Sequence, residues 1–116
     1  MHYSPDIISR VEEIHCLIMQ NPARRFYVAE LARQASLPVE ILNNAFRLHY
    51  GLTIPQCIVQ AKMSRAVDML LDHHPIKEIA AELGYKHVVS FHKAFRKTMG
   101  LTATQYYLQH RQPRKP

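Results

Sequence analysis

Glycine, cysteine and long hydrophobic runs are scarce in this 116-residue chain, and each scarcity excludes a class of protein. Three glycines are too few for a glycine-rich phosphate-binding loop. The two cysteines, Cys16 and Cys57, lie far apart and form no CxxC pair, so we expect neither a disulfide framework nor a zinc cluster. No apolar run approaches the roughly 18 residues that span a bilayer. Because the first residues also lack the regions of a secretory signal, we predict a cytoplasmic protein of one domain.

Catalytic and metal-binding patterns are missing as well. The eight histidines form neither HxxxH nor HExxH. His73 and His74 are neighbours at a helix end, where consecutive side chains point apart. No serine or cysteine nucleophile with an adjacent base can be assigned. We therefore expect no enzyme activity, no cofactor and no metal site.

Acidic residues are unevenly distributed along the chain. Residues 1–58 hold five basic and five acidic residues, whereas residues 59–116 hold ten basic and four acidic ones. No acid occurs from Leu83 to the end of the chain. Such one-sided charge is typical of a protein that binds a polyanion, and a basic protein with a solvated tail is the alternative. The basic residues of the acid-free stretch are Lys86, Lys93, Arg96, Lys97, Arg111, Arg114 and Lys115.

Apolar residues recur at helical spacing throughout the chain, and no alternating pattern of a strand is found. Asp6 is expected to cap the first helix, and Asn21-Pro22 to stop it. We predict an all-α fold of seven helices, and residues 111–116 are predicted to be a disordered basic tail. The predicted helices cover about residues 6–20, 28–33, 39–49, 55–73, 76–83, 87–98 and 103–110.

An internal repeat is the most informative feature of the sequence. Each copy is predicted to be a short helix, a tight turn and a longer helix, which is the helix-turn-helix plan. Gly84 in the second turn indicates a left-handed backbone, while Ser36 in the first predicts a turn that is less demanding or differently built. The matching segments are Glu30-Leu31-Ala32 and Glu78-Ile79-Ala80, Ala45-Phe46-Arg47 and Ala94-Phe95-Arg96, and Gly51-Leu52-Thr53 and Gly100-Leu101-Thr102.

The second copy carries a resemblance to a known family. Its pattern is Ile76-x-x-Ile79-Ala80-x-x-x-Gly84-Tyr85, then Phe91-x-x-x-Phe95-Arg96-Lys97-x-x-Gly100-x-Thr102-x-x-x-Tyr106. Over about residues 6–107 the chain resembles the DNA-binding domain of AraC/XylS-type transcription regulators. The resemblance implies two helix-turn-helix motifs joined by a long linker helix, and binding of double-stranded DNA that regulates transcription. The chain departs from the family pattern at Lys62, usually Arg, at Ala103, usually Pro, and at His87, often a small polar residue.

The predicted domain covers residues 5–110, with subdomains at 5–54 and 75–110 and the linker helix at 55–74. A helix from Gln56 to His73 is about 27 Å long at about 1.5 Å per residue. With its flanking motifs it can hold two recognition helices about 34 Å apart, which is one turn of duplex DNA. We therefore expect one monomer to read two successive major grooves, with no partner subunit required.

The outward positions of the two longer helices are the candidate DNA contacts. By resemblance, bases are read at positions six, three and two residues before the docking phenylalanine of each motif. Asparagine can pair with adenine and glutamate can accept from cytosine, so the first motif is expected to discriminate bases and the second mainly to add affinity. Base readout is assigned to Glu40, Asn43, Asn44, Val89, His92 and Lys93, and phosphate contact to Arg47, Arg96 and Lys97.

Two alternatives stay open at this point. Any one of these side chains could be an ordinary solvated surface residue. The whole chain could also be a basic helical interaction module that contacts RNA polymerase, itself a candidate partner, or another regulator. Salt dependence separates the two functions, because DNA binding weakens steeply with salt and a packed protein interface does not.

Overall fold

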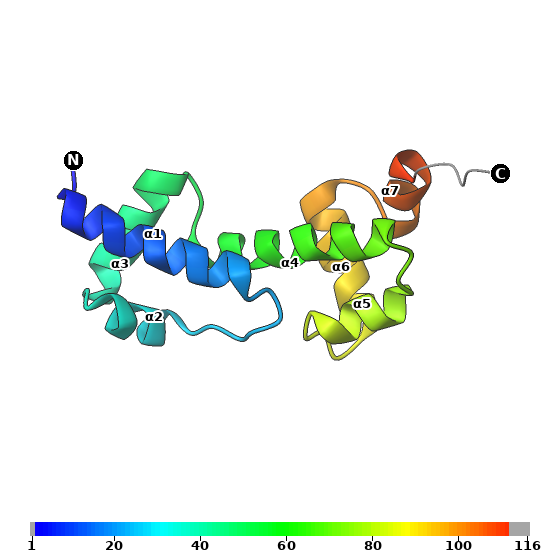
Figure 1. Ribbon diagram of the computed structural model, residues 1–116, viewed down its shortest axis with the longest axis horizontal. Coiled ribbons are helices and arrows are strands. Elements are labelled where there is room, and N and C mark those ends of the chain that lie inside the picture. Colours follow the sequence, from blue (N-terminus) through cyan, green and yellow to red (C-terminus); the bar gives the residue numbers. More distant parts are fainter. Residues whose placement is uncertain (1, 112–116) are drawn as a thin grey trace. The chain divides into compact units, whose positions relative to one another are not determined.

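The computed structural model describes residues 2–111, and within that range it contains seven α-helices and no strand (Figure 1). The predicted all-α class is confirmed. The predicted disordered tail lies, beyond Arg111, outside the described residues. None of the described helices is both long enough and apolar enough to cross a membrane. The helices are α1 (Pro5–Gln20), α2 (Val28–Ala35), α3 (Val39–Tyr50), α4 (Ile54–Leu71), α5 (Ile76–Glu82), α6 (Val88–Met99) and α7 (Ala103–His110).

The start of α1 differs from the prediction. Ser4, not Asp6, is the N-cap, and its side-chain oxygen accepts a hydrogen bond from the Ile7 N–H at 3.3 Å. Pro5 occupies the first helical position, where its missing N–H costs nothing. Asp6 lies in the first turn instead and forms an ion pair with Arg10 at 2.8 Å. The prediction that Asp6 caps the helix was wrong because the helix begins at Pro5, two residues earlier than a cap at Asp6 requires, with Ser4 capping the Ile7 N–H.

The chain divides into two compact units, Met1–Ala61 and Lys62–Pro116, and the division falls inside α4. The predicted linker at 55–74 overlaps this helix. In the first unit, α1, α2, α3 and the start of α4 enclose one apolar core. Its buried members are Val11, Ile14, Ile18, Leu31, Ala32, Ala35, Leu42, Ala45, Phe46, Ile54, Cys57 and Ala61.

The second unit is built around aromatic rings. Phe91 and Phe95 on α6 are fully buried, with ring centroids 5.9 Å apart. Tyr85 meets Phe91 edge-on at 5.8 Å, and Tyr106 of α7 meets Phe95 in the same way at 5.8 Å. Edge-to-face rings at this spacing are favourable contacts. The other buried side chains of the unit are Met63, Ala66, Met69, Leu70, Ile79, Ala80, Leu83 and Ala103.

The repeat is longer in the structure than the sequence indicates, and α4 belongs to both copies. Reciprocal hydrogen bonds between Thr53 and Gln56 begin α4, and those between Thr102 and Gln105 begin α7, 49 positions later. The first half of α4 therefore corresponds to α7, and its second half corresponds to α1. Three buried positions of α1 return in α4 at an offset of 52: Val11 as Met63, Ile14 as Ala66, and Ile18 as Leu70.

Candidate nucleic-acid interface

The two turns that precede the longer helices have the same backbone. Gly84 has φ +85°, as its sequence position predicts, and Ser36 has φ +55°, also in the left-handed region. The expectation of a less demanding or differently built first turn is therefore wrong, and a serine takes the conformation that glycine prefers. The hydrogen bonds agree: Leu37 N–H donates to Ala32 O and Tyr85 N–H to Ala80 O, and Ser36 N–H donates to Arg33 O and Gly84 N–H to Ala81 O.

Each turn is followed by a helix that two large side chains dock onto its own unit. Leu42 and Phe46 of α3 are fully buried, and so are Phe91 and Phe95 of α6. Residues four apart lie on one face of a helix, so both docking faces are fixed in the same register. The opposite face of each helix is consequently turned outward.

The outward face of α3 carries uncompensated polar groups. Glu40, Asn43, Asn44 and Arg47 are all exposed. Their spacing of three and four residues places them side by side along the helix. None of their side chains has a hydrogen-bond or ion-pair partner within residues 2–111. Their donors and acceptors are thus available to a ligand, in the arrangement expected of a helix that reads base edges.

The outward face of α6 is cationic and partly apolar. Val89 is 62% exposed, which settles its placement on the surface. His92, Lys93, Arg96 and Lys97 are exposed too, although the His92 ring lies 5.8 Å from the ring of Phe91. No acidic residue occurs on α6. The structure therefore brings each predicted group of residues together on its own helix.

The groups with shifted pKa values lie behind these faces. Burial raises the pKa of Tyr50 at the end of α3, and Glu12 adds to the shift by repelling the phenolate. Burial likewise raises the pKa of Tyr85 and of the Cys57 thiol. All three groups are therefore held in their neutral forms, as residues of the supporting structure.

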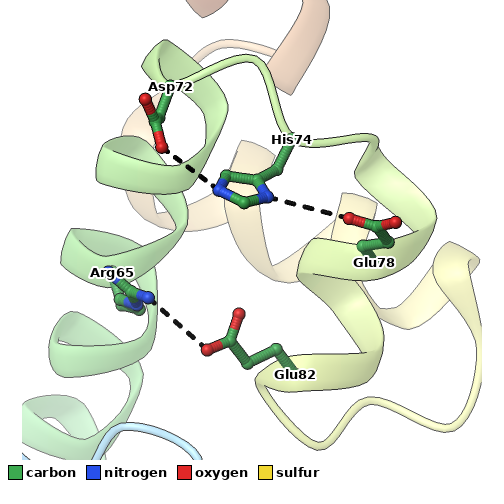
Figure 2. A network of polar contacts seen from close by, with 5 residues as sticks. All are labelled: Arg65, Asp72, His74, Glu78 and Glu82. Atoms are coloured by element: carbon green, nitrogen blue, oxygen red, sulfur yellow. Dashed lines mark hydrogen bonds and ion pairs between the residues drawn. The ribbon is translucent and has the colours of Figure 1, made fainter.

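Polar contacts between α4, the following connection and α5 support the second motif, and the sequence analysis did not identify them (Figure 2). Arg65 pairs with Glu82 of α5 at 3.5 Å. The two ring nitrogens of His74 approach Asp72 at 3.2 Å and Glu78 at 3.7 Å. Arg65 and Glu82 lie 17 residues apart, so no local pattern reveals that pair, whereas the His74 contacts join residues two and four positions apart. Among the described residues, no group of three acids, histidines or cysteines could hold a metal ion.

Two matched helix-turn-helix motifs with open polar faces define a class of DNA-binding protein. A family described as "Helix-turn-helix domain" matches residues 31–109. The chain belongs to this AraC-type helix-turn-helix family, whose domains bind DNA and regulate transcription.

Relatives and solved structures agree with this assignment. Over 100 residues the chain is 29% identical to the HTH-type transcriptional activator RhaR of Mannheimia succiniciproducens, covering 85% of the chain and 36% of RhaR. It spans 36% of the length of the curated relatives it matches. The C-terminal domain of AraT, a response regulator from Geobacillus stearothermophilus, has the same fold, with a TM-score of 0.83, 22% identity, and coverage of 100% of this chain and 94% of that one. The DNA-binding domain of AdpA in complex with a target DNA has a TM-score of 0.77 at 20% identity, covering 86% and 91%.

Proposed function

We propose that one molecule of this chain places α3 and α6 in two successive major-groove segments of its DNA site. The observation that carries the proposal is the pair of turns at Ser36 and Gly84, with one backbone conformation and one hydrogen-bond pattern. Each turn presents a docked helix whose exposed face is rich in unpaired donors. Since both motifs lie on one chain, a single molecule can read both segments, and we propose that it binds as a monomer.

The roles of the side chains follow from their chemistry. Amide and carboxylate groups can tell base edges apart, whereas guanidinium and ammonium groups at the far end of each face suit phosphates. The valine suits the methyl group of thymine. We assign base readout to Glu40, Asn43, Asn44, Val89, His92 and Lys93, and phosphate contact to Arg47, Arg96 and Lys97.

Other features support this proposal. AdpA, which shares the fold, has been solved with its target DNA. RhaR is a transcriptional activator, and we extend the proposal to contact with RNA polymerase as a route to activation. The relatives are bacterial proteins, so a DNA-bound regulator of this kind acts in the cytoplasm.

The test begins with selection of bound sequences from a random duplex pool. Hydroxyl-radical footprinting on the selected site should then show two protected segments about one duplex turn apart. Sedimentation of the complex should give one chain per site. Protection of a single groove segment, or binding only by a dimer, would refute the proposed geometry.

A further inference from the structure

The segment that leads into the first motif is longer and more basic than its counterpart in the second. Between α1 and α2 lie the seven residues 21–27, whereas α4 and α5 are joined by the four residues 72–75. The longer connection, here called the arginine loop (residues 21–27), contains Arg24 and Arg25. The shorter one contains no arginine or lysine, and its Asp72 is paired with His74 (Figure 2).

The arginine loop is anchored at both ends. At its start, the Asn21 side chain donates a hydrogen bond to the Leu17 carbonyl oxygen at 2.8 Å. Near its end, Phe26 packs against the core of the first unit. The Arg24 guanidinium carbon lies 5.1 Å from the centre of the Phe26 ring, a cation–π contact that restrains the arginine. The anchored ends and the Phe26 ring therefore restrain Arg24, and Arg25 follows it on the same anchored segment.

The charges of the loop are open to a ligand. Arg24 and Arg25 are exposed, and neither forms an ion pair with any residue that the structure describes. Glu30 is the one acid nearby in sequence, so residues 21–31 carry a formal charge of +1. The equivalent residues 72–79 carry −1, because Asp72 and Glu78 outnumber Lys77. The segment before the first motif therefore attracts an anion, whereas the equivalent segment before the second motif does not.

The place of the loop in the motif identifies the anion. In a helix-turn-helix, the first helix crosses the DNA backbone while the second enters the major groove. The arginine loop immediately precedes α2, the first helix of the first motif, and the start of that helix has no side-chain cap. The positive end of the helix and the two arginines are separated by only a few residues, so one DNA strand can reach both.

We infer that the arginine loop binds backbone phosphates beside the first half-site, adding an anchor that the second motif lacks. This inference rests on the proposed function. The contact positions the first recognition helix without reading sequence. Arg24 and Arg25 are two of the five basic residues that balance the five acids of the first unit, so the loop concentrates positive charge in a unit with no net formal charge.

Binding of the full chain to its selected duplex, measured by fluorescence anisotropy from 50 to 300 mM salt, tests the inference. Arg25→Gln should lower the slope of log K against log salt by about 0.9 and weaken binding about eightfold at about 0.1 M salt. Arg25→Lys should restore most of the salt slope and most of the affinity. Arg111→Gln, which removes the same charge at the end of α7, is the matched control and should leave the slope unchanged. Arg24→Gln should behave as Arg25→Gln, and its melting temperature shows whether loss of the Phe26 contact alters folding.

Ethylation interference then locates the contact. In wild-type complexes, modification of one or two phosphates next to the first half-site should block binding, and Arg25→Gln should abolish that interference alone. If wild-type protein binds two half-sites but Arg25→Gln keeps the wild-type slope and interference pattern, the arginine loop has no such role. If wild-type protein binds no duplex, the proposed function itself has failed.

Discussion

Lys62 of α4 donates a hydrogen bond from Nζ to the carbonyl oxygen of Leu83 at 2.7 Å. Leu83 is the C-cap that follows α5, so the lysine satisfies a carbonyl at the C-terminal end of the first helix of the second motif. The first motif has a similar arrangement, since Arg10 of α1 donates to the carbonyl oxygens of Ala35 at 3.5 Å and Ser36 at 3.1 Å, the positions that match Leu83 and Gly84. In each copy, a basic side chain on the preceding helix fastens the turn that positions the recognition helix.

We expect Lys62→Met to destabilise the protein by about 1–2 kcal/mol, because it removes a charge-assisted hydrogen bond and leaves a carbonyl with no donor. Lys62 also lies 5.8 Å from the ring centre of Tyr85, and methionine loses that contact too. Lys62→Arg, the residue usual in the family, should recover most of the loss. Urea denaturation measures the free energy of unfolding of both variants, with Lys93→Met as the exposed control. Equal stability of Lys62→Met and wild type would show that the bond contributes nothing.

The two left-handed turn residues should respond in opposite directions. Gly84→Val should lower the free energy of unfolding by about 1–3 kcal/mol, because a β-branched residue resists φ +85°. Ser36→Gly should raise it by about 0.5–1 kcal/mol, since it removes strain at φ +55°. Thermal unfolding of both variants checks the pair. An unchanged midpoint for Gly84→Val would contradict the assigned backbone.

Arg96→Ala and Lys97→Ala should weaken binding to all DNA sequences alike. Both side chains are exposed at the end of α6 that suits phosphate contact, and each lost contact should reduce the salt slope by about 0.9. Affinities for the selected site and for an unrelated duplex, measured at several salt concentrations, provide the comparison. A changed base preference at constant slope would make these residues readers of sequence.

The two half-sites should differ in specificity. Glu40, Asn43 and Asn44 offer donors and acceptors, and a good bidentate pair discriminates against a wrong base by about 1–3 kcal/mol. Val89 and Lys93 offer a methyl contact and a charge. Single-base substitution across the selected site should therefore give larger penalties at the half-site of α3 than at that of α6. The reverse profile would overturn the division, and sequence-dependent DNA shape would appear as penalties at uncontacted positions.

Alkaline pH should destabilise the second unit through Tyr85. Its pKa is raised by burial, so the unfolded chain loses the phenolic proton first, near the ordinary value of about 10. The stabilising contribution of the neutral phenol is complete below that pH and is lost as the pH rises toward the higher native pKa. Between pH 9 and 11, Tyr85→Phe should lose less melting temperature than wild type, whereas exposed Tyr27→Phe should follow wild type. Parallel declines for all three proteins would contradict this cause.

Much of the fold was predictable because its boundaries carry local signals. Asn21-Pro22 is expected to stop the first helix, and α1 ends at Gln20. The left-handed conformation of Ser36 was not predictable, because serine gives no sign of a positive φ when tertiary packing imposes it. The bonds from Arg10 and Lys62 were also missed, since they join residues that are distant in sequence.

The candidate site was predictable in placement, and its chemistry remains a proposal. The spacing from Phe46 and Phe95 was enough to identify the outward faces, because a docked helix exposes whatever lies opposite its buried pair. The arginine loop escaped notice because its meaning comes from comparison of two connections whose lengths are known only once the helix ends are known.

Helix α4 contributes buried side chains to both units. Ala61 is buried in the core of the first unit, and Met63, only two residues later, is buried in the second. Unwinding a single turn at the middle of α4 therefore removes apolar contacts from both cores at once, and helix formation is itself cooperative. We therefore expect a helix-breaking change at that turn to lower the stability of both units, although it lies outside both helix-turn-helix motifs.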